Sequence, residues 1–173
     1  MIPTLQVGDR ISVRNKKDKK FSRGEIVTFA SPYKFDPLLK KSIQPSKWCD
    51  LHEIPYVGIL FQNLIKSRSC DTYIKRLVAL PGEKVFVNKR GEVQINGKLL
   101  SEPYVKNYCE GQICSRINES LVPSDHFLVL GDNRSNSWDS RYWPGGPFIH
   151  KKYVRGVAYQ IWFPFERSRQ LNP

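Results

Sequence analysis

The chain has 173 residues and a formal net charge of +12, from 28 lysines and arginines against 16 acidic residues. A chain of this length is expected to form one domain that buries about two-thirds of its unfolded surface. The charge favours a polyanionic partner, either nucleic acid or an anionic lipid surface. No apolar run approaches the roughly 18 residues that a membrane span requires, and no signal-peptide pattern follows Met1. The composition therefore excludes a transmembrane helix within these residues.

The basic residues gather in three runs, Arg14–Arg23, Lys151–Arg155 and Arg167–Arg169. Taken alone, such runs are as often solvated loops as binding surfaces. If the Arg14–Arg23 loop lies near the aromatic residues of a cleft rim, we expect it to draw the domain to anionic membranes. Each basic residue close to such a surface contributes on the order of 1 kcal/mol.

The first half of the chain predicts short strands and one irregular stretch. Residues 7–13 are typical of a turn that leads into a short alternating strand, and residues 25–29 predict a second strand. Residues 31–72 have few periodic apolar positions and contain Pro32, Pro37, Pro45 and Pro55. We expect this stretch to be an insertion within a single domain of residues 1–173.

The second half predicts further strands at residues 73–80, 84–87, 127–130 and 156–162, and a frayed polar tail from Pro164. The segments 92–95 and 98–100 flank Asn96-Gly97, which tolerates the positive φ values of a two-residue type I′ hairpin turn. Because the strands are many and short, and no amphipathic helix is convincing, the sequence predicts an all-β domain with antiparallel sheets.

The chain has four cysteines, Cys49, Cys70, Cys109 and Cys114. Their spacing is not that of a zinc site, so no metal or other cofactor is expected. Cys109 and Cys114 flank a short turn that a disulfide can close in an oxidising compartment. A second bond between Cys49 and Cys70, or four free thiols, are the alternatives.

The most informative stretch is Phe127–Trp143, FLVLGDNRSNSWDSRYW. It begins as an apolar strand and then carries carboxylates, arginines, amides and hydroxyls in close succession. A turn whose side chains bond their own backbone needs only some of these residues, in almost any order. The order GDNR-x-N-S-x-D-S-R resembles the C-terminal signature of type I signal peptidases of the bacterial and cyanobacterial type. These are membrane-anchored Ser/Lys proteases that remove signal peptides.

Two further segments carry this resemblance. Tyr73-Ile74-Lys75-Arg76 and the LVALPGE that follows resemble the family segment with the lysine base, and residues 1–5, MIPTL, resemble the end of its S-M-x-P-T-L nucleophile motif. The three motifs stand in the family's order and cover most of the chain except residues 31–72. The sequence begins at Met1, so the serine and the single-pass anchor that the family places before it fall outside these residues. The 173-residue chain by itself is therefore expected to be inactive.

Lys75 lies in a run of apolar strand residues, where a lysine is rarely buried unless it is paired or functional. Burial disfavours the charged ammonium and can lower its pKa by up to about 3–5 units from about 10.4. A neutral amine can accept the proton of a serine hydroxyl, which arginine cannot do because it stays protonated. The alternative is a strand lysine whose amine reaches solvent or pairs with an acid.

The resemblance implies that Ser137 orients the Lys75 amine through a hydrogen bond, so that the strands around residues 74–80 and 127–131 lie side by side. Asp139 and Arg141, two residues apart, share one side of an extended segment and are expected to form an ion pair. Arg76 is expected on the face opposite Lys75. The side chains expected to support the lysine are Ser137, Asp132, Asn133, Asp139, Arg141 and Arg76.

The resemblance also implies that an extended signal-peptide segment adds as a strand to exposed backbone, with small side chains entering shallow apolar pockets. The matching positions are Met1, Leu5, Tyr73, Ile74 and Val129. A core role is the alternative for each, above all for Val129. The implied partners are signal peptides of pre-proteins and an anionic membrane, with the catalytic domain on its outer, periplasmic or lumenal face, and no nucleic acid.

Three other functions are open. A self-cleaving repressor-type peptidase uses a related Ser/Lys pair, but it needs a DNA-binding module, and the helix signals of one are not present. A basic β-barrel would bind nucleic acid, although the aromatic residues are not interleaved with the basic runs as a stacking platform requires. A signal peptidase homologue without its serine would be catalytically dead.

Overall fold

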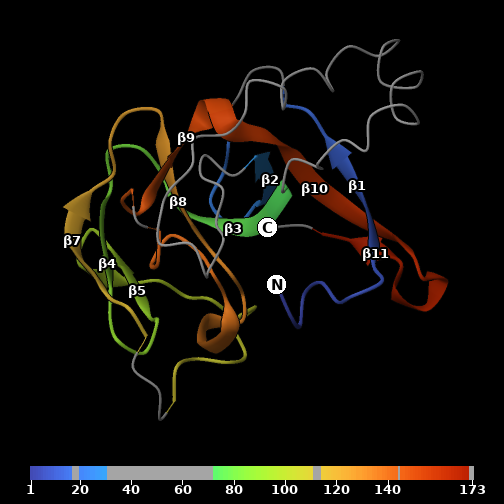
Figure 1. The fold of residues 1–173 in the computed structure, drawn as a ribbon, viewed down its shortest axis with the longest axis horizontal. Helices are drawn as coiled ribbons and strands as arrows, with labels where there is room; N and C mark the ends of the chain where they lie inside the picture. Colours follow the sequence, from blue (N-terminus) through green and yellow to red (C-terminus); the bar gives the residue numbers. More distant parts are fainter. Residues whose placement is uncertain (17–19, 31–71, 111–113, 144, 172–173) are drawn as a thin grey trace.

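The structure is a computed structural model that describes residues 1–16, 20–30, 72–110, 114–143 and 145–171 (Figure 1). The insertion expected at about residues 31–72 lies outside the described residues, apart from Thr72. The same is true of Cys49 and Cys70.

The larger sheet has the strand order β1-β10-β2-β3-β8-β9, with β11 pairing to β10. Its strands are β1 (Arg10–Arg14), β2 (Ile26–Ala30), β3 (Thr72–Ala79), β8 (His126–Leu130), β9 (Phe148–His150), β10 (Val154–Phe163) and β11 (Arg169–Gln170). All of these neighbours are antiparallel. The prediction of an all-β, antiparallel fold is confirmed, as is the expected pairing of β3 with β8.

The smaller sheet lies to the left in Figure 1 and has the order β6-β5-β4-β7. Its strands are β4 (Lys84–Val87), β5 (Val93–Ile95), β6 (Lys98–Leu99) and β7 (Ile117–Leu121). Asn96 and Gly97 join β5 to β6 with φ values of 51° and 77°, so the expected hairpin turn is present. The short 3-10 helices are η2 (Arg134–Asn136), η3 (Lys151–Tyr153) and η4 (Phe165–Arg167). Within the described residues, no helix is long and apolar enough to cross a membrane.

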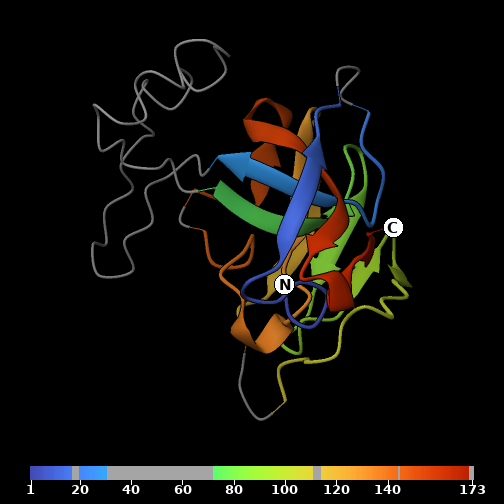
Figure 2. The ribbon, with the colours of Figure 1, turned by 90° about the vertical axis from the view of Figure 1, so that its right-hand side faces the viewer.

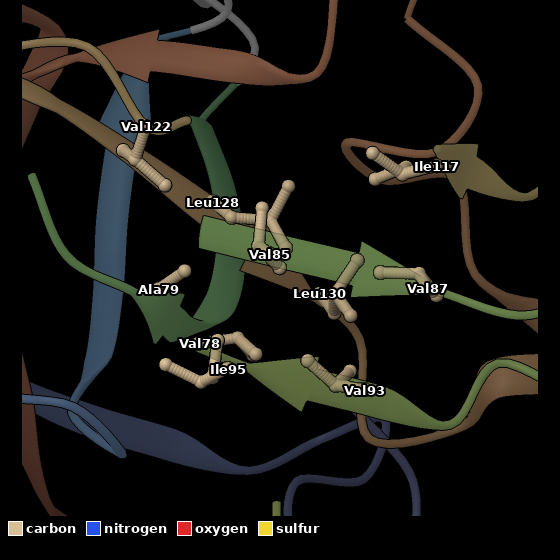
Figure 3. Close-up of a cluster of buried hydrophobic side chains, with 10 residues drawn as sticks. All are labelled: Val78, Ala79, Val85, Val87, Val93, Ile95, Ile117, Val122, Leu128 and Leu130. Atoms are coloured by element: carbon tan, nitrogen blue, oxygen red, sulfur yellow. The ribbon is translucent and has the colours of Figure 1, made fainter. Parts of the chain in front are cut away.

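The two sheets pack face to face over an aliphatic core (Figure 3). The larger sheet contributes Val78, Ala79, Leu128 and Leu130, and the smaller sheet and its connections contribute Val85, Val87, Val93, Ile95, Ile117 and Val122. The opposite side of β3 and β8 is buried as well, through Leu77 and Val129. Each such side chain stabilises the fold by about 1.5–3 kcal/mol when fully buried. Packing on both faces therefore fixes the paired ends of β3 and β8. The polar residues that follow β8 are attached to this rigid part of the sheet.

The two ends of the chain compare differently with the sequence predictions. The expected turn leads into β1 at Arg10, after turns closed by hydrogen bonds from Leu5 N to Met1 O and from Asp9 N to Gln6 O. The prediction for the other end is wrong. The tail after Pro164 does not fray but forms η4 and β11. Leu171 buries its side chain, and this single apolar residue in a polar tail was too weak a signal in the sequence.

Candidate active site

Lys75 lies on β3 immediately before the point at which β3 pairs with β8. Arg76 is opposite Leu130, the last residue of β8, whereas Lys75 has Val27 of β2 as its partner on the other edge. Within the described part of the chain, no strand pairs with the β8-side edge of Thr72–Lys75. The lysine thus lies where no described strand covers the β8-side edge of Ile74 and Lys75.

The Lys75 amine is partly buried, and its Nζ donates to the Ile74 carbonyl oxygen at 3.2 Å. It also lies 5.9 Å from the centre of the Tyr73 ring. Burial lowers the pKa of Lys75 below its ordinary value of 10.5, while the carboxylates of Asp139 and Asp132 act in the opposite direction. Since burial dominates, the neutral amine forms at a lower pH than in an exposed lysine.

Gly131 directly follows β8 and packs against Ser137. A Cβ atom at residue 131 would lie 2.1 Å from Ser137 Oγ and 2.6 Å from Ser137 Cβ, so any larger residue would displace the serine. Gly131 N donates to Asp139 Oδ2 at 3.0 Å, which fixes the carboxylate at the same place. Glycine is thus required here for a close approach and not for an unusual φ angle.

The Ser137 hydroxyl is buried and, among the described residues, has no hydrogen-bond partner. The hydrogen bond expected between Lys75 and Ser137 is therefore not formed in this structure, because the lysine donates to Ile74 instead. A buried hydroxyl without a partner costs about 1–3 kcal/mol in lost solvation.

Asp132 is fully buried and joins three segments of the chain. Arg76 binds it through two hydrogen bonds, Nε to Oδ1 at 2.8 Å and Nη2 to Oδ2 at 2.7 Å. The Thr4 hydroxyl donates to the same Oδ2 atom. The Arg76 guanidinium also stacks 3.9 Å from the centre of the Tyr104 ring. The sequence analysis placed Asp132 among the supporting residues but did not identify Thr4, whose only signal was a hydroxyl in the MIPTL segment.

Asp139 and Arg141 form the expected ion pair, with Nε to Oδ1 at 2.8 Å and Nη2 to Oδ2 at 2.9 Å, and both side chains are buried. Arg141 Nη2 also donates to the Arg134 carbonyl oxygen at 2.8 Å. Asn133 caps η2, since its side-chain oxygen accepts from Asn136 N at 3.2 Å. These contacts hold the turn that follows β8.

Arg134 was not singled out from the sequence, yet its side chain is among the most buried in the described structure. Its Nη2 atom donates to Glu102 Oε1 at 2.5 Å, and its Nε atom donates to the Gly131 carbonyl oxygen at 3.0 Å. Burial and the Glu102 carboxylate raise the pKa of Tyr104, whose hydroxyl donates to Glu102 at 2.9 Å. In the sequence, only the arginine of the GDNR motif pointed to this buried contact. Nothing in the sequence identifies Glu102 as its partner.

Cys109 and Cys114 are joined by a disulfide, with their Cα atoms 6.0 Å apart. Both sulfur atoms lie beside the Arg134 carbonyl oxygen, at 3.4 and 3.5 Å. The disulfide therefore packs against the polar turn that contains Arg134.

The N-terminal turn brings Met1 towards Lys75. Burial lowers the pKa of the Met1 amino group below its ordinary value of 8.0, and the charge of Lys75 lowers it further, against the effects of Asp132 and Asp139. The Met1 nitrogen and the lysine amine thus lie in the field of the same two carboxylates.

The residues expected to bind substrate lie in different surroundings, and one of them, Val129, lies in the core. Leu5 is buried in a cluster against which Met1 and Ile74 pack, whereas Tyr73 stacks on Phe29 with ring centres 6.0 Å apart. Val129 is completely buried, and its N–H and carbonyl groups are bonded to Ser140. Val129 is therefore a core residue, which was the alternative that the sequence left open.

Comparison with known proteins gives a family for this arrangement. A model of the family described as signal peptidase, peptidase S26, matches residues 1–163. The chain is 32% identical over 174 residues to the probable signal peptidase I-2 of Synechocystis sp., a match that covers 99% of this chain and 63% of that protein. It is 34% identical over 176 residues to the signal peptidase I of Leptolyngbya laminosa, covering 100% and 69% of the two chains.

Among solved structures, a signal peptidase I from Enterococcus faecalis matches with 28% sequence identity and a TM-score of 0.49, over 80% of this chain and 96% of that one. The chain spans less than two-thirds of the length of the Synechocystis relative. The family model covers all three motifs, from the N-terminal turn through Lys75 to the polar turn after β8. The chain belongs to the signal peptidase family, peptidase S26.

Proposed function

We propose that this chain is the catalytic domain of a serine endopeptidase that removes signal peptides, with Lys75 as the general base for a serine immediately before Met1. The observation that carries the proposal is the link between the N-terminal turn and β3: the Thr4 hydroxyl donates to Asp132, and Arg76, the residue after Lys75, binds the same carboxylate. Met1 and Ile74 also pack against one cluster, so a residue joined to the Met1 nitrogen would precede a turn that is held against the strand of Lys75.

In the proposed reaction, the neutral Lys75 amine takes the proton of the serine hydroxyl while the serine oxygen attacks the carbonyl carbon of the scissile peptide bond. The peptide C–N bond then breaks, and the lysine ammonium gives its proton to the departing amine. This leaves an acyl-enzyme ester. The Lys75 amine next takes a proton from a water molecule as the water oxygen attacks the ester carbonyl carbon. The ester C–O bond then breaks, and the lysine ammonium returns the proton to the serine oxygen.

The β8-side edge of β3 at Ile74 and Lys75, which no described strand covers, supports a mode of substrate binding. An extended peptide can pair with this edge as an added strand, and its scissile bond would then lie next to the lysine. Tyr73 and Ile74 lie on this part of β3, and Ile74 and Met1 pack against the cluster that contains Leu5. We expect these apolar side chains to favour short apolar side chains before the cut. Signal peptides that end in small residues fit this description.

The direct test is to compare residues 1–173 alone with the same chain carrying one serine immediately before Met1. The serine-bearing chain is expected to cut a pre-protein after the small residues of an Ala-x-Ala site, and a chain with alanine at the same place is the control. The cleaved products are measured by mass spectrometry. Cleavage by residues 1–173 alone would show that another residue is the nucleophile and would refute the proposal.

Replacing Ser137 with alanine separates a structural role from a catalytic one. Because the Ser137 hydroxyl makes no hydrogen bond within the described residues, its removal is expected to leave the free energy of unfolding unchanged or to raise it by about 1 kcal/mol. If Ser137 orients the Lys75 amine once substrate is bound, the same change lowers kcat of the serine-bearing chain by about 10- to 100-fold. Equal activity of the two chains would remove Ser137 from the mechanism.

We also propose that the domain contacts the outer, periplasmic or lumenal face of an anionic membrane. The surface that we propose for this membrane contact is not the Arg14–Arg23 loop that the sequence suggested. Lys16 pairs with Glu25 at 2.6 Å, and Arg23 pairs with Glu83, so both charges are engaged within the protein. The loop also follows the end of β1 at Arg14, whereas the exposed aromatic residues flank the start of β1.

The aromatic surface consists of Trp162, Phe163 and Phe165, which are 42%, 37% and 77% exposed. The Arg10 guanidinium lies 5.6 Å from the centre of the Trp162 ring and 5.1 Å from that of Phe163. Apolar rings beside a basic side chain are typical of a surface that lies in the interface of a membrane.

The Trp162→Ser/Phe165→Ser double variant is expected to reduce co-sedimentation with anionic vesicles at low salt. Leu99 and Leu121 are equally exposed on the smaller sheet, and Leu99→Ser/Leu121→Ser is the matched control that should bind like the parent. Higher salt should weaken the binding of all variants, because it screens the attraction of Arg10. Tighter binding to duplex nucleic acid than to vesicles would favour a basic binding module instead.

A further inference from the structure

The C-terminal segment of residues 164–171 lies beyond the residues that the family model matches, which end at residue 163. It nevertheless returns to the N-terminal turn of the catalytic site. In Figure 2 the C-terminal strand, in red, lies beside the N-terminal segment, in blue. The contacts between the two segments are specific and come from three residues, Arg167, Arg169 and Leu171.

Arg169 contacts the N-terminal turn directly. Its Nη2 atom donates to the Thr4 carbonyl oxygen at 2.6 Å. The Thr4 hydroxyl donates on its other side to Asp132, which also binds Arg76. Thr4 is therefore held between the C-terminal strand and the buried aspartate of the polar turn.

Arg167 and Leu171 fix the same segment from either side of Arg169. Arg167 forms two hydrogen bonds with Asp9, at 2.7 and 2.9 Å, and these lower the pKa of that carboxyl group. Leu171 packs in the cluster that contains Leu5 and Ile161. Its N–H donates to the Tyr159 carbonyl oxygen at 2.8 Å, so the segment is tied to β10 at the same time.

The turn needs such support because it is short. Its internal hydrogen bond, from Leu5 N to Met1 O, spans 3.0 Å and closes a single turn. A displacement of about 1 Å of a reacting group costs about 100-fold in rate. The residue before Met1 takes its position from this turn, so contacts that hold Thr4 also determine where that residue lies.

We infer that residues 164–171 are a positioning element for the catalytic turn, and that Arg169 is the positioning residue that acts on it through the Thr4 carbonyl group. The inference rests on the proposed function for its catalytic consequence. Its structural part, the restraint of the turn, is independent of that function and has a test of its own.

The structural part is tested in residues 1–173 by amide hydrogen exchange at Leu5. Arg169→Met keeps the aliphatic stem but removes the donors, and it is expected to speed exchange of the Leu5 amide about tenfold. Arg169→Lys, whose ammonium can donate to the same carbonyl, should restore much of the protection. The control is Arg116→Ala, which removes the same charge from an exposed position before β7 and should leave Leu5 exchange unchanged.

The catalytic part is tested in the chain with serine before Met1. Arg169→Met is expected to lower kcat by about 10- to 100-fold while KM changes by less than about twofold, because the turn and not the substrate edge is disturbed. Arg169→Lys should recover most of kcat, and Arg116→Ala should match the parent. A lower melting temperature with normal kcat would mean that Arg169 only stabilises the fold, and this would overturn the inference.

The two tests separate the inference from the proposed function. If Leu5 exchange responds but the serine-bearing parent does not cut, the positioning element stands and the proposed function fails. If Leu5 exchange in Arg169→Met equals that of the parent, the positioning role is overturned whether or not the parent cuts.

Discussion

Replacing Lys75 with alanine in the chain that carries serine before Met1 is expected to lower kcat/KM by at least about 10⁴-fold, because the general base is removed. The fold should survive, since loss of a partly buried amine also removes its cost of desolvation. Cleavage of a purified pre-protein gives the rate, and circular dichroism with thermal melting establishes that the variant is folded.

Two further variants sharpen this result. Lys75→Arg keeps the positive charge but stays protonated at every accessible pH, so it should be as inactive as the alanine variant. Lys98→Ala removes an exposed lysine from the β5–β6 hairpin and should retain the parent activity. If Lys75→Ala cuts at a rate comparable with the parent, the Ser/Lys mechanism is wrong for this chain.

Replacing Arg134 with methionine is expected to cost about 3–5 kcal/mol in the free energy of unfolding, because Glu102 would remain buried without its partner charge. The two side chains are almost completely excluded from solvent and meet at 2.5 Å. The measurement is equilibrium unfolding in urea at neutral pH. The substitution also removes the hydrogen bond that Arg134 Nε donates to the Gly131 carbonyl oxygen after β8.

A double variant tests the reason for this loss. Arg134→Met combined with Glu102→Gln removes both charges, and it should recover a large part of the lost stability because no uncompensated charge remains. A single variant that loses less than about 1 kcal/mol, or a double variant no more stable than the single one, would show that the ion pair is not the cause.

The strands and the hairpin could be predicted because their signals are local. Asn96-Gly97 specifies its own turn, and the apolar runs before Gly131 and after Arg76 specify two buried strands. The ion pair between Asp139 and Arg141 follows from a spacing of two residues. In each case the interacting residues are close in the sequence, so the pattern contains the contact.

The contacts that complete the site could not be predicted because they join distant residues. Arg134 and Glu102 are 32 positions apart, Thr4 and Asp132 are 128 apart, and Arg167 and Asp9 are 158 apart. Neither partner of such a pair has a local signal that identifies the other. The ordered C-terminal segment was missed for the same reason, since its order depends on long-range contacts.

The pH dependence of kcat/KM for the serine-bearing chain tests the central claim most directly, because it reports the pKa of the essential base in the free enzyme. Burial lowers the pKa of Lys75 from 10.5, and only the neutral amine can accept the serine proton. We therefore expect kcat/KM to rise with pH and to reach half of its maximum below pH 10.5. A rate that is flat or falls as pH rises, or one with a midpoint at or above 10.5, would contradict it.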